Sequence, residues 1–217
     1  MPPSQFVPKG TIYRDANEKR DLESRNGYIQ AAFVVDAAQN WTPESRLTPE
    51  LICEIQRLAV NQIYRCAGHF RDGAVTLGVD HVPPDHEAVP GYVDAMCEYV
   101  QENWGKPAIH LSSYLTWRMN WIHPFFGGNG RTARVVSYLI LCARLGFVLP
   151  GTPTIPELIV RDRTPYYDAL RKADESFRDG VIDLSEMEEL MDSLLAAQLV
   201  SIHEMATGKP AQVKRRK

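Results

Sequence analysis

The sequence predicts a mainly α-helical protein, and three observations lead to this class. Several long stretches place apolar residues three and four positions apart, the period of a helix with one buried face. Only one stretch alternates in the manner of a β-strand, and no internal repeat is present. The chain has 217 residues, of which 44% are hydrophobic and 24% charged. This length and composition predict one globular domain, or a domain with an appended helical segment.

The N-terminal part of the chain predicts an extended arm followed by two helices. Residues 1–12 contain three prolines and form the arm. Residues 17–38 read as a long helix, with Gly27 as a weak point or break. Thr48 followed by Pro49 is the usual opening of a second helix, a capping residue before a proline at the first helical position.

The alternating stretch covers residues 74–80, where Val75, Leu77 and Val79 take turns with smaller or polar residues. Two prolines close behind it exclude an interior strand, so we expect a short hairpin or flap there. The next stretch, residues 89–102, again has the helical period.

Two apolar helices are expected on either side of a glycine-rich turn. The first covers residues 109–122 and should end at His123, because Pro124 disfavours helical geometry at the residue before it. The second runs from Arg131 to a stop at Gly146, with Asn129 as its N-cap. A short element from Thr154 and helices over residues 165–174 and 185–206 complete the chain.

The turn between these two helices predicts an anion site beside a base. Glycines at 127, 128 and 130 lead into the start of a buried helix, where free backbone N–H groups and the positive end of the helix dipole favour phosphate. Arg131 and Arg134 lie three residues apart and could add forked donors. His123 could take a proton from a hydroxyl group nearby. Each part also has a plain structural interpretation, as a core histidine or an ordinary turn.

The order His123-Pro-Phe-Phe-Gly-Gly-Asn-Gly-Arg-Thr-Ala-Arg134 resembles the signature of the Fic (Fic/Doc) family, His-Pro-Phe-x-Asp/Glu-Gly-Asn-Gly-Arg-x-x-Arg. Eight of its nine specified positions match, and Gly127 departs from it. The resemblance implies a Fic-type helical bundle with a short β-hairpin flap. It also suggests a domain core over residues 48–195, between an N-terminal arm and helix over residues 1–47 and a C-terminal helix end with a basic tail over residues 196–217.

Family members typically move AMP from ATP to a Ser, Thr or Tyr hydroxyl of a target protein, and relatives move UMP, phosphocholine or phosphate. By this resemblance His123 is the general base and Phe125 anchors the loop in the core. The implied phosphate-binding positions are Gly128, Asn129, Gly130, Arg131 and Arg134. ATP would be the donor substrate.

The departure at Gly127 concerns the metal. The family usually has an acidic residue there, which holds the Mg²⁺ that bridges the phosphates, and glycine has no side-chain oxygen. Since Mg²⁺ often takes only one or two protein carboxylates, we expect weakly held Mg²⁺ and no protein metal ligand. The alternative is a degenerate Fic-fold protein that binds nucleotide or partner proteins without transferring AMP.

The resemblance also implies partners. A target protein would dock by strand addition on the flap near residues 74–83, where an unpaired edge is a template for an extended peptide; the alternative is a purely structural hairpin. Many relatives carry an inhibitory Ser/Thr-x-x-x-Glu-Gly/Asn segment. In those relatives the glutamate of this segment pairs with the second arginine of the motif. This chain does not contain that sequence, so either Arg134 is unrestrained, or a separate inhibitory protein supplies the glutamate, or an unlike segment of this chain does so.

Composition limits the remaining possibilities. A formal net charge of −3 gives no general attraction to nucleic acid or to a membrane surface. The N-terminus lacks the basic and apolar regions of a signal peptide, so we expect a cytoplasmic protein, with a secreted effector as the alternative. The four cysteines form no Cys-x-x-Cys pair and are expected to be free thiols. Residues 209–217 are expected to be a solubilising basic terminus.

Overall fold

The computed structural model describes residues 10–77 and 81–208. The chain divides into two compact units, Met1–Phe147 and Val148–Lys217, which are described separately below. The predicted mainly α class is confirmed. The helices of the first unit are α1 (Ala16–Gln39), α2 (Pro49–Val60), the short 3₁₀ turn η1 (His86–Ala88), α3 (Val89–Glu102), α4 (Ala108–Ile122) and α5 (Asn129–Leu145). The domain boundaries after residues 47 and 195 stay predictions.

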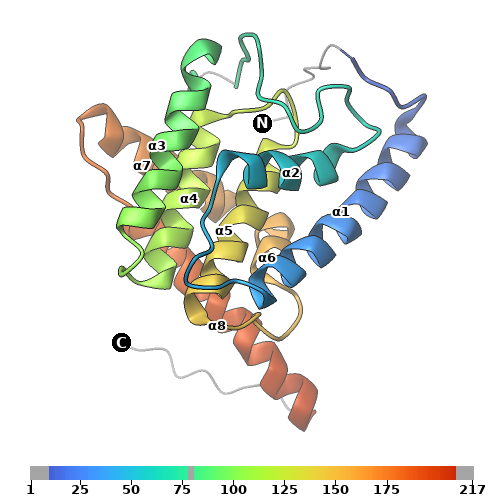
Figure 1. Cartoon of the computed structure of the whole chain (residues 1–217). Coiled ribbons are helices and arrows are strands. Elements are labelled where there is room, and N and C mark those ends of the chain that lie inside the picture. The colour runs from blue at the N-terminus through green and yellow to red at the C-terminus, as the bar shows by residue number, and fades with distance from the viewer. Residues whose placement is uncertain (1–9, 78–80, 209–217) are drawn as a thin grey trace. The chain divides into compact units, whose positions relative to one another are not determined.

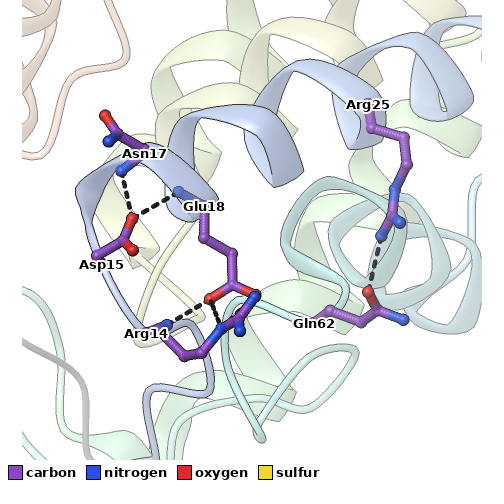
Figure 2. Close-up of polar contacts among 6 residues, drawn as sticks. All are labelled: Arg14, Asp15, Asn17, Glu18, Arg25 and Gln62. Carbon is purple, nitrogen blue, oxygen red and sulfur yellow. Dashed lines mark hydrogen bonds and ion pairs between the residues drawn. The ribbon is translucent and has the colours of Figure 1, made fainter.

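Helix α1 begins where its sequence offers a cap (Figure 2). The carboxylate of Asp15 accepts hydrogen bonds from the backbone N–H groups of Asn17 and Glu18, at 2.8 and 2.9 Å. Glu18 in turn accepts from the guanidinium of Arg14. These contacts satisfy donors of the first turn that have no partner within the helix.

The expected break at Gly27 is wrong, because α1 continues through it to Gln39. Polar side chains on both sides of the glycine fasten this part of α1 to α2 and the residues after it. Asn26 donates to the carbonyl of Asn61 at 2.7 Å, and Gln30 donates to the carbonyl of Ile55 at 2.8 Å. Both side chains are buried, so their contacts compensate for the low helix propensity of glycine.

Replacing Gly27 with alanine is expected to stabilise the protein. A Cβ at this position would meet no atom within 4 Å, and its φ is not positive. Alanine loses less backbone entropy than glycine on folding, which should raise the free energy of unfolding by about 0.5–1 kcal/mol. Urea denaturation monitored by circular dichroism would measure the change. A lower denaturation midpoint would contradict the open space that the structure gives this position.

Helix α5 is the centre of the first unit, since it contacts α1, α2 and α4 (Figure 1). Its contact with α4 is the most extensive between any two of the described helices. Both helices contribute fully buried apolar side chains to this contact. They include Leu111, Leu115, Met119 and Ile122 of α4 and Ala133, Val136, Leu139 and Ile140 of α5. The buried hydroxyl of Ser112 donates to the carbonyl of Ser137, which ties the two helices by a polar contact as well.

The predicted strand over residues 74–80 is wrong for the part that the structure describes. Leu77 and His81 form one isolated antiparallel bridge, and Ala74–Thr76 are in no strand. Residues 78–80 lie outside the described residues. The backbone on both sides is held in another way, because the carbonyls of Gly73 and Pro84 accept hydrogen bonds from Arg71. The predicted β-hairpin flap is therefore not confirmed, since this bridge is what the described residues show of it.

The second unit contains α6 (Ile155–Arg161), α7 (Thr164–Arg178) and α8 (Ser185–Thr207), as expected from the helical periods. Helix α8 contacts both of the others. Its buried Gln198 accepts from the backbone N–H of Ile155 at 2.8 Å and donates to the carbonyls of Leu149 and Pro150. Thr154 and Glu157 form the capping box at the start of α6. The basic residues 209–217 lie outside the described residues.

The four cysteines are free thiols, as expected. Cys53, Cys66, Cys97 and Cys142 are all free thiols in the structure. Burial raises the pKa of Cys97 to about 12 and that of Cys53 to about 11, so neither thiol is activated as a nucleophile.

Within residues 10–77 and 81–208, none of the helices combines the length and the apolar character that a membrane crossing requires.

Candidate functional site

His123 lies at the end of α4, as Pro124 predicts. Its backbone is left-handed, with φ 49° and ψ 59°, and its N–H still donates to the carbonyl of Met119 at 3.0 Å. Positive φ is uncommon for a residue with a side chain, and such backbone conformations concentrate at functional sites. The chain turns here and presents the imidazole at the junction between α4 and the glycine-rich loop.

The environment of His123 favours the neutral imidazole. Burial is the main cause, and the positive charge of Arg71 and the neighbouring His81 add to it; together they lower the pKa of His123 to about 3. A hydrogen bond with the backbone of Asn120 acts in the opposite direction. At neutral pH the ring is therefore uncharged and can accept a proton.

Arg71 holds the backbone around His123, and sequence reasoning gave it no role. Its side chain is only 3% exposed. The Nε atom donates to the carbonyl of His123 at 2.9 Å, while Nη1 and Nη2 donate to the carbonyls of Gly73 and Pro84 at 3.1 and 2.5 Å. Its own backbone N–H donates to the carbonyl of Pro124 at 2.9 Å. One guanidinium thus connects the His123 turn with both ends of the segment predicted to be a flap.

Asn129 closes the loop between Phe125 and α5. Its side-chain oxygen accepts from the backbone N–H of Phe125 at 2.9 Å, and its side-chain nitrogen donates to the carbonyl of Phe125 at 2.7 Å. The expected N-cap role is wrong, because α5 begins at Asn129 and Gly128 precedes it. Phe125 thus fixes the orientation of the Asn129 carboxamide, which keeps a second N–H donor, and the backbone N–H of Asn129 lies in the first turn of α5.

Replacing Asn129 with alanine should therefore loosen the loop. Phe125 is fully buried, and the substitution leaves its N–H and C=O without the partners they now have. Unsatisfied buried backbone groups cost about 1–3 kcal/mol, so we expect unfolding to become easier by about 2 kcal/mol. Thermal or chemical denaturation would show this loss. Asn129→Ser, which can keep one of the two hydrogen bonds, should lose less; equal losses would contradict the two-bond clamp.

The glycines predict an anion site at the first turn of α5, and the structure shows how this turn is built. Gly128 has φ +80°, and a Cβ there would lie 2.8 Å from Cγ1 of Val60, so only glycine fits. The backbone N–H groups of Asn129, Gly130 and Arg131 have no carbonyl acceptor within the helix, as in any first turn. Nη1 of Arg134 lies 3.4 Å from the place of a Cβ on Gly130, which brings this guanidinium to the same turn.

The side chain of Arg131 contacts both α1 and α2. Its Nη1 donates to the carbonyl of Ala59 at 2.8 Å, and Nη2 forms an ion pair with Glu23 of α1 at 3.1 Å. Both charged side chains are partly exposed, with exposed fractions of 28% and 36%. Arginine has five N–H donors, so these two contacts leave capacity for an anion. Arg131, at the start of α5, thus contacts both α1 and the end of α2.

Gln56 fastens the glycine-rich loop to the rest of the unit and was also missed. The side chain is fully buried in α2. Its nitrogen donates to the carbonyl of Gly127 at 3.0 Å, and its oxygen accepts from the backbone N–H of Gly68 at 2.6 Å. The loop that carries the anion site and the loop that leads to Arg71 therefore depend on one carboxamide.

A Mg²⁺ ion does not fit the side chains of this loop. Gly127 has no side-chain oxygen, and its carbonyl already accepts from Gln56. The described part of the chain contains no group of three or more His, Cys, Asp or Glu side chains that could hold a metal. Mg²⁺ needs oxygen ligands in near-octahedral geometry. The donors that surround this site are N–H groups and guanidinium groups, which suit phosphate oxygens instead.

Comparison with known proteins shows what this chain is similar to. A family model described as the Fic/DOC family matches residues 46–141. A protein adenylyltransferase Fic of Nematostella vectensis is 32% identical over 175 residues, which cover 78% of this chain and 37% of that protein. A protein of the same name from Aedes aegypti is 28% identical over 182 residues, covering 79% of this chain and 32% of that protein. The chain thus spans about a third of the length of these relatives.

Solved structures show the same fold. A Fic domain containing signaling protein from Bacteroides thetaiotaomicron matches with a TM-score of 0.70 and 20% identity, over 92% of this chain and 78% of that one. Fic-1 from C. elegans matches with a TM-score of 0.68 and 22% identity, over 95% of this chain and 56% of that one. The predicted Fic-type bundle is confirmed by these similarities.

Proposed function

Because residues 46–141 of this chain form a Fic/DOC-family domain, we propose that it is a protein adenylyltransferase, which moves AMP from ATP to a Ser, Thr or Tyr hydroxyl of a target protein. The observation that supports the proposal is a neutral histidine in the loop that leads to the predicted anion site. Phe125, two residues after His123, is clamped to Asn129 at the start of α5, so the base and the anion site belong to one closed loop. Relatives with the name protein adenylyltransferase support this activity at the level of the family.

In the proposed reaction His123 accepts the proton of the target hydroxyl. The hydroxyl oxygen forms a bond to the α-phosphorus of ATP, and the bond from this phosphorus to the bridging oxygen of pyrophosphate breaks. Pyrophosphate leaves with the electron pair, and the proton stays on the imidazole until solvent removes it. A pKa well below neutrality keeps His123 in the form that this step requires.

The anion site would bind the phosphates and stabilise their charge. The proposed contacts are the backbone N–H groups of Asn129, Gly130 and Arg131 and the guanidinium groups of Arg131 and Arg134. Donors fixed before the reaction lower the barrier without reorganising during it. Gly128 contributes by bringing the loop against Val60 with no side chain in between.

The target protein would dock near residues 74–83, beside the base. His81 supports this position, because its Nε2 atom lies 2.7 Å from the carbonyl of Trp121, two residues before His123. The next residue, Val82, is 86% exposed and offers an apolar contact. A target segment held along these residues would bring its hydroxyl group close to the imidazole.

A second candidate function follows from Gly127. The loop offers no carboxylate for a cation, so the chain could bind nucleotide and partner proteins without transferring AMP. The two candidates differ in their products. Only the transferase makes a covalent bond between AMP and protein.

The test incubates the protein and a cell lysate with ATP labelled either on the α-phosphate or on the γ-phosphate. An adenylyltransferase labels protein from the first donor only. Label from neither donor, combined with measurable ATP binding in an equilibrium titration, would support the binding protein. Label from the γ-phosphate that exceeds the label in lysate without this protein, or label from UTP or CDP-choline alone, would contradict AMP transfer and identify another group.

A further inference from the structure

The ring of Tyr64 occupies the space beside Gly127. A Cβ on Gly127 would lie 2.6 Å from Cε2, 3.1 Å from Cδ2 and 3.3 Å from Cζ of this ring. Carbon atoms in van der Waals contact are about 3.5–4.0 Å apart. The backbone itself would accept a side chain, because Gly127 is not among the glycines with positive φ. The tyrosine ring is therefore what excludes a side chain from this position.

The backbone of Tyr64 is fixed on both sides. Its N–H donates to the carbonyl of Val60 at 3.2 Å, and its own carbonyl accepts from Ala67 at 3.3 Å. Tyr64 also forms an antiparallel bridge with Thr11. The side chain packs against a buried cluster made of Ala59, Val60 and Ile63. The ring cannot swing away without giving up this packing.

The loop on the other side is fixed as well. The carbonyl of Gly127 accepts from Gln56, and the next residue, Gly128, is already in close contact with Val60. A side chain at position 127 would thus be caught between a held ring and a held loop. Overpacking of this kind usually destabilises a protein.

We infer that Tyr64 and Gly127 form a matched pair that closes the position where a cation-binding carboxylate would stand, so that this chain binds a nucleoside triphosphate without a side-chain ligand for Mg²⁺ from position 127. The packing part of this inference stands on contacts alone. The part about the cation depends on the proposed function, because it assumes that the loop binds ATP. Positive charge for the phosphates would come from Arg131, Arg134 and the first-turn N–H groups.

The packing part is tested by thermal unfolding of four proteins: the natural chain, Gly127→Asp, Tyr64→Ala and the double variant. Gly127→Asp should lower the unfolding temperature of the natural chain by roughly 3–10 °C, given usual overpacking costs and a chain of this length. In the Tyr64→Ala variant, Gly127→Asp should lower the unfolding temperature by less than half of the loss that it causes in the natural chain. Equal losses in both backgrounds, or no loss in the natural chain, would overturn the pair.

Three further variants act as controls. Gly91→Asp introduces the same side chain in the first turn of α3, where a Cβ meets nothing within 4 Å, and should cause no loss. Tyr64→Phe keeps the ring, so Gly127→Asp should remain as costly as before. Tyr64→Val replaces Tyr64→Ala if the smaller residue prevents folding, because it also lacks the ring atoms that lie close to Gly127.

The cation part is tested by the affinity for ATP with Mg²⁺ and with EDTA, measured by titration calorimetry. The natural chain should bind ATP with an affinity that Mg²⁺ changes by less than about threefold. The double variant Gly127→Asp/Tyr64→Ala should gain at least about tenfold from Mg²⁺, a step of about 1.4 kcal/mol. A tenfold gain by the natural chain, or none by the double variant, would overturn this part.

Failure of the proposed function and failure of the Tyr64–Gly127 pair give different results. If the natural chain binds no ATP under either condition, the proposed function fails. The unfolding temperatures of the four proteins still decide whether Tyr64 excludes a side chain at position 127. If ATP binds and Gly127→Asp lowers the unfolding temperature equally with and without Tyr64→Ala, the proposed function stands and the matched pair is wrong.

Discussion

Replacing His123 with alanine is expected to lower the rate of AMP transfer by about 10²–10⁴-fold, the usual loss when a general base is removed. The imidazole is neutral in the folded protein and lies in the loop that Asn129 closes onto the start of α5. Its loss removes the proton acceptor and leaves the first-turn N–H groups and Arg134 in place. Binding of ATP should therefore change by less than about threefold, while single-turnover transfer slows.

The matched control is His203→Ala. His203 lies on α8 and is exposed, and the expected transfer rate is that of the natural chain. A His123→Ala protein that transfers AMP at the natural rate would exclude His123 as the base. A protein that has lost ATP binding together with transfer would give His123 a role in the nucleotide site instead.

The pH dependence gives a second measurement of the same prediction. The pKa of His123 is lowered to about 3, so the free protein keeps its base unprotonated throughout pH 5.5–8. The kcat/KM for transfer should show no acid limb near pH 6.5, where an ordinary histidine titrates. The free energy of unfolding, by contrast, should depend on pH in the acid range. The unfolded chain takes up the proton first as pH falls below about 6.5, so the folded state loses stability from there downward.

Much of this site could be predicted from short stretches of sequence. Pro124 predicted the end of α4 at His123, and Thr48 with Pro49 predicted the start of α2. Gly146 predicted the end of α5, where its φ is 79°. Each of these signals acts through the conformation of one or two residues. Local steric rules are sufficient to read them.

The missed residues act over long distances in the chain. Gln56 contacts a carbonyl 71 residues away, and Arg71 contacts one 52 residues away. No periodic pattern specifies such a contact. A signal was nevertheless present for Gln56, since a polar residue lies within the apolar stripe of α2, next to Ile55. Buried polar side chains are usually hydrogen-bonded, so a glutamine in that stripe indicates a partner in the fold.

The N-cap expectation for Asn129 failed for a related reason. Asparagine is a common N-cap, and the residue lies at the start of a helix. In the structure its carboxamide contacts both backbone groups of Phe125, four residues earlier, and the helix begins at Asn129 itself. The choice between two local partners depends on the turn at Gly128, whose φ of +80° could not be known from the sequence.

Replacing Arg71 with alanine is expected to have the largest effect on stability. The guanidinium is buried and donates to the carbonyls of His123, Gly73 and Pro84. Its removal leaves these half-buried acceptors without their donors, and we expect the free energy of unfolding to fall by about 3 kcal/mol. Chemical denaturation would measure the loss. The same substitution removes a positive charge that lowers the pKa of His123, so that pKa should rise.

Arg71→Lys separates the effect of the positive charge at position 71 from the effect of the hydrogen bonds that the guanidinium donates. Lysine keeps the positive charge, but its ammonium group lacks the planar fork that now reaches several carbonyls. We expect Arg71→Lys to lose stability as well, while the pKa of His123, followed by NMR titration of the ring, rises less than in Arg71→Ala. Arg57→Ala is the control, since Arg57 is exposed and pairs with nearby Glu54. If Arg71→Ala were no less stable than Arg57→Ala, the turn at His123 would have to be held by the loop and α4 alone.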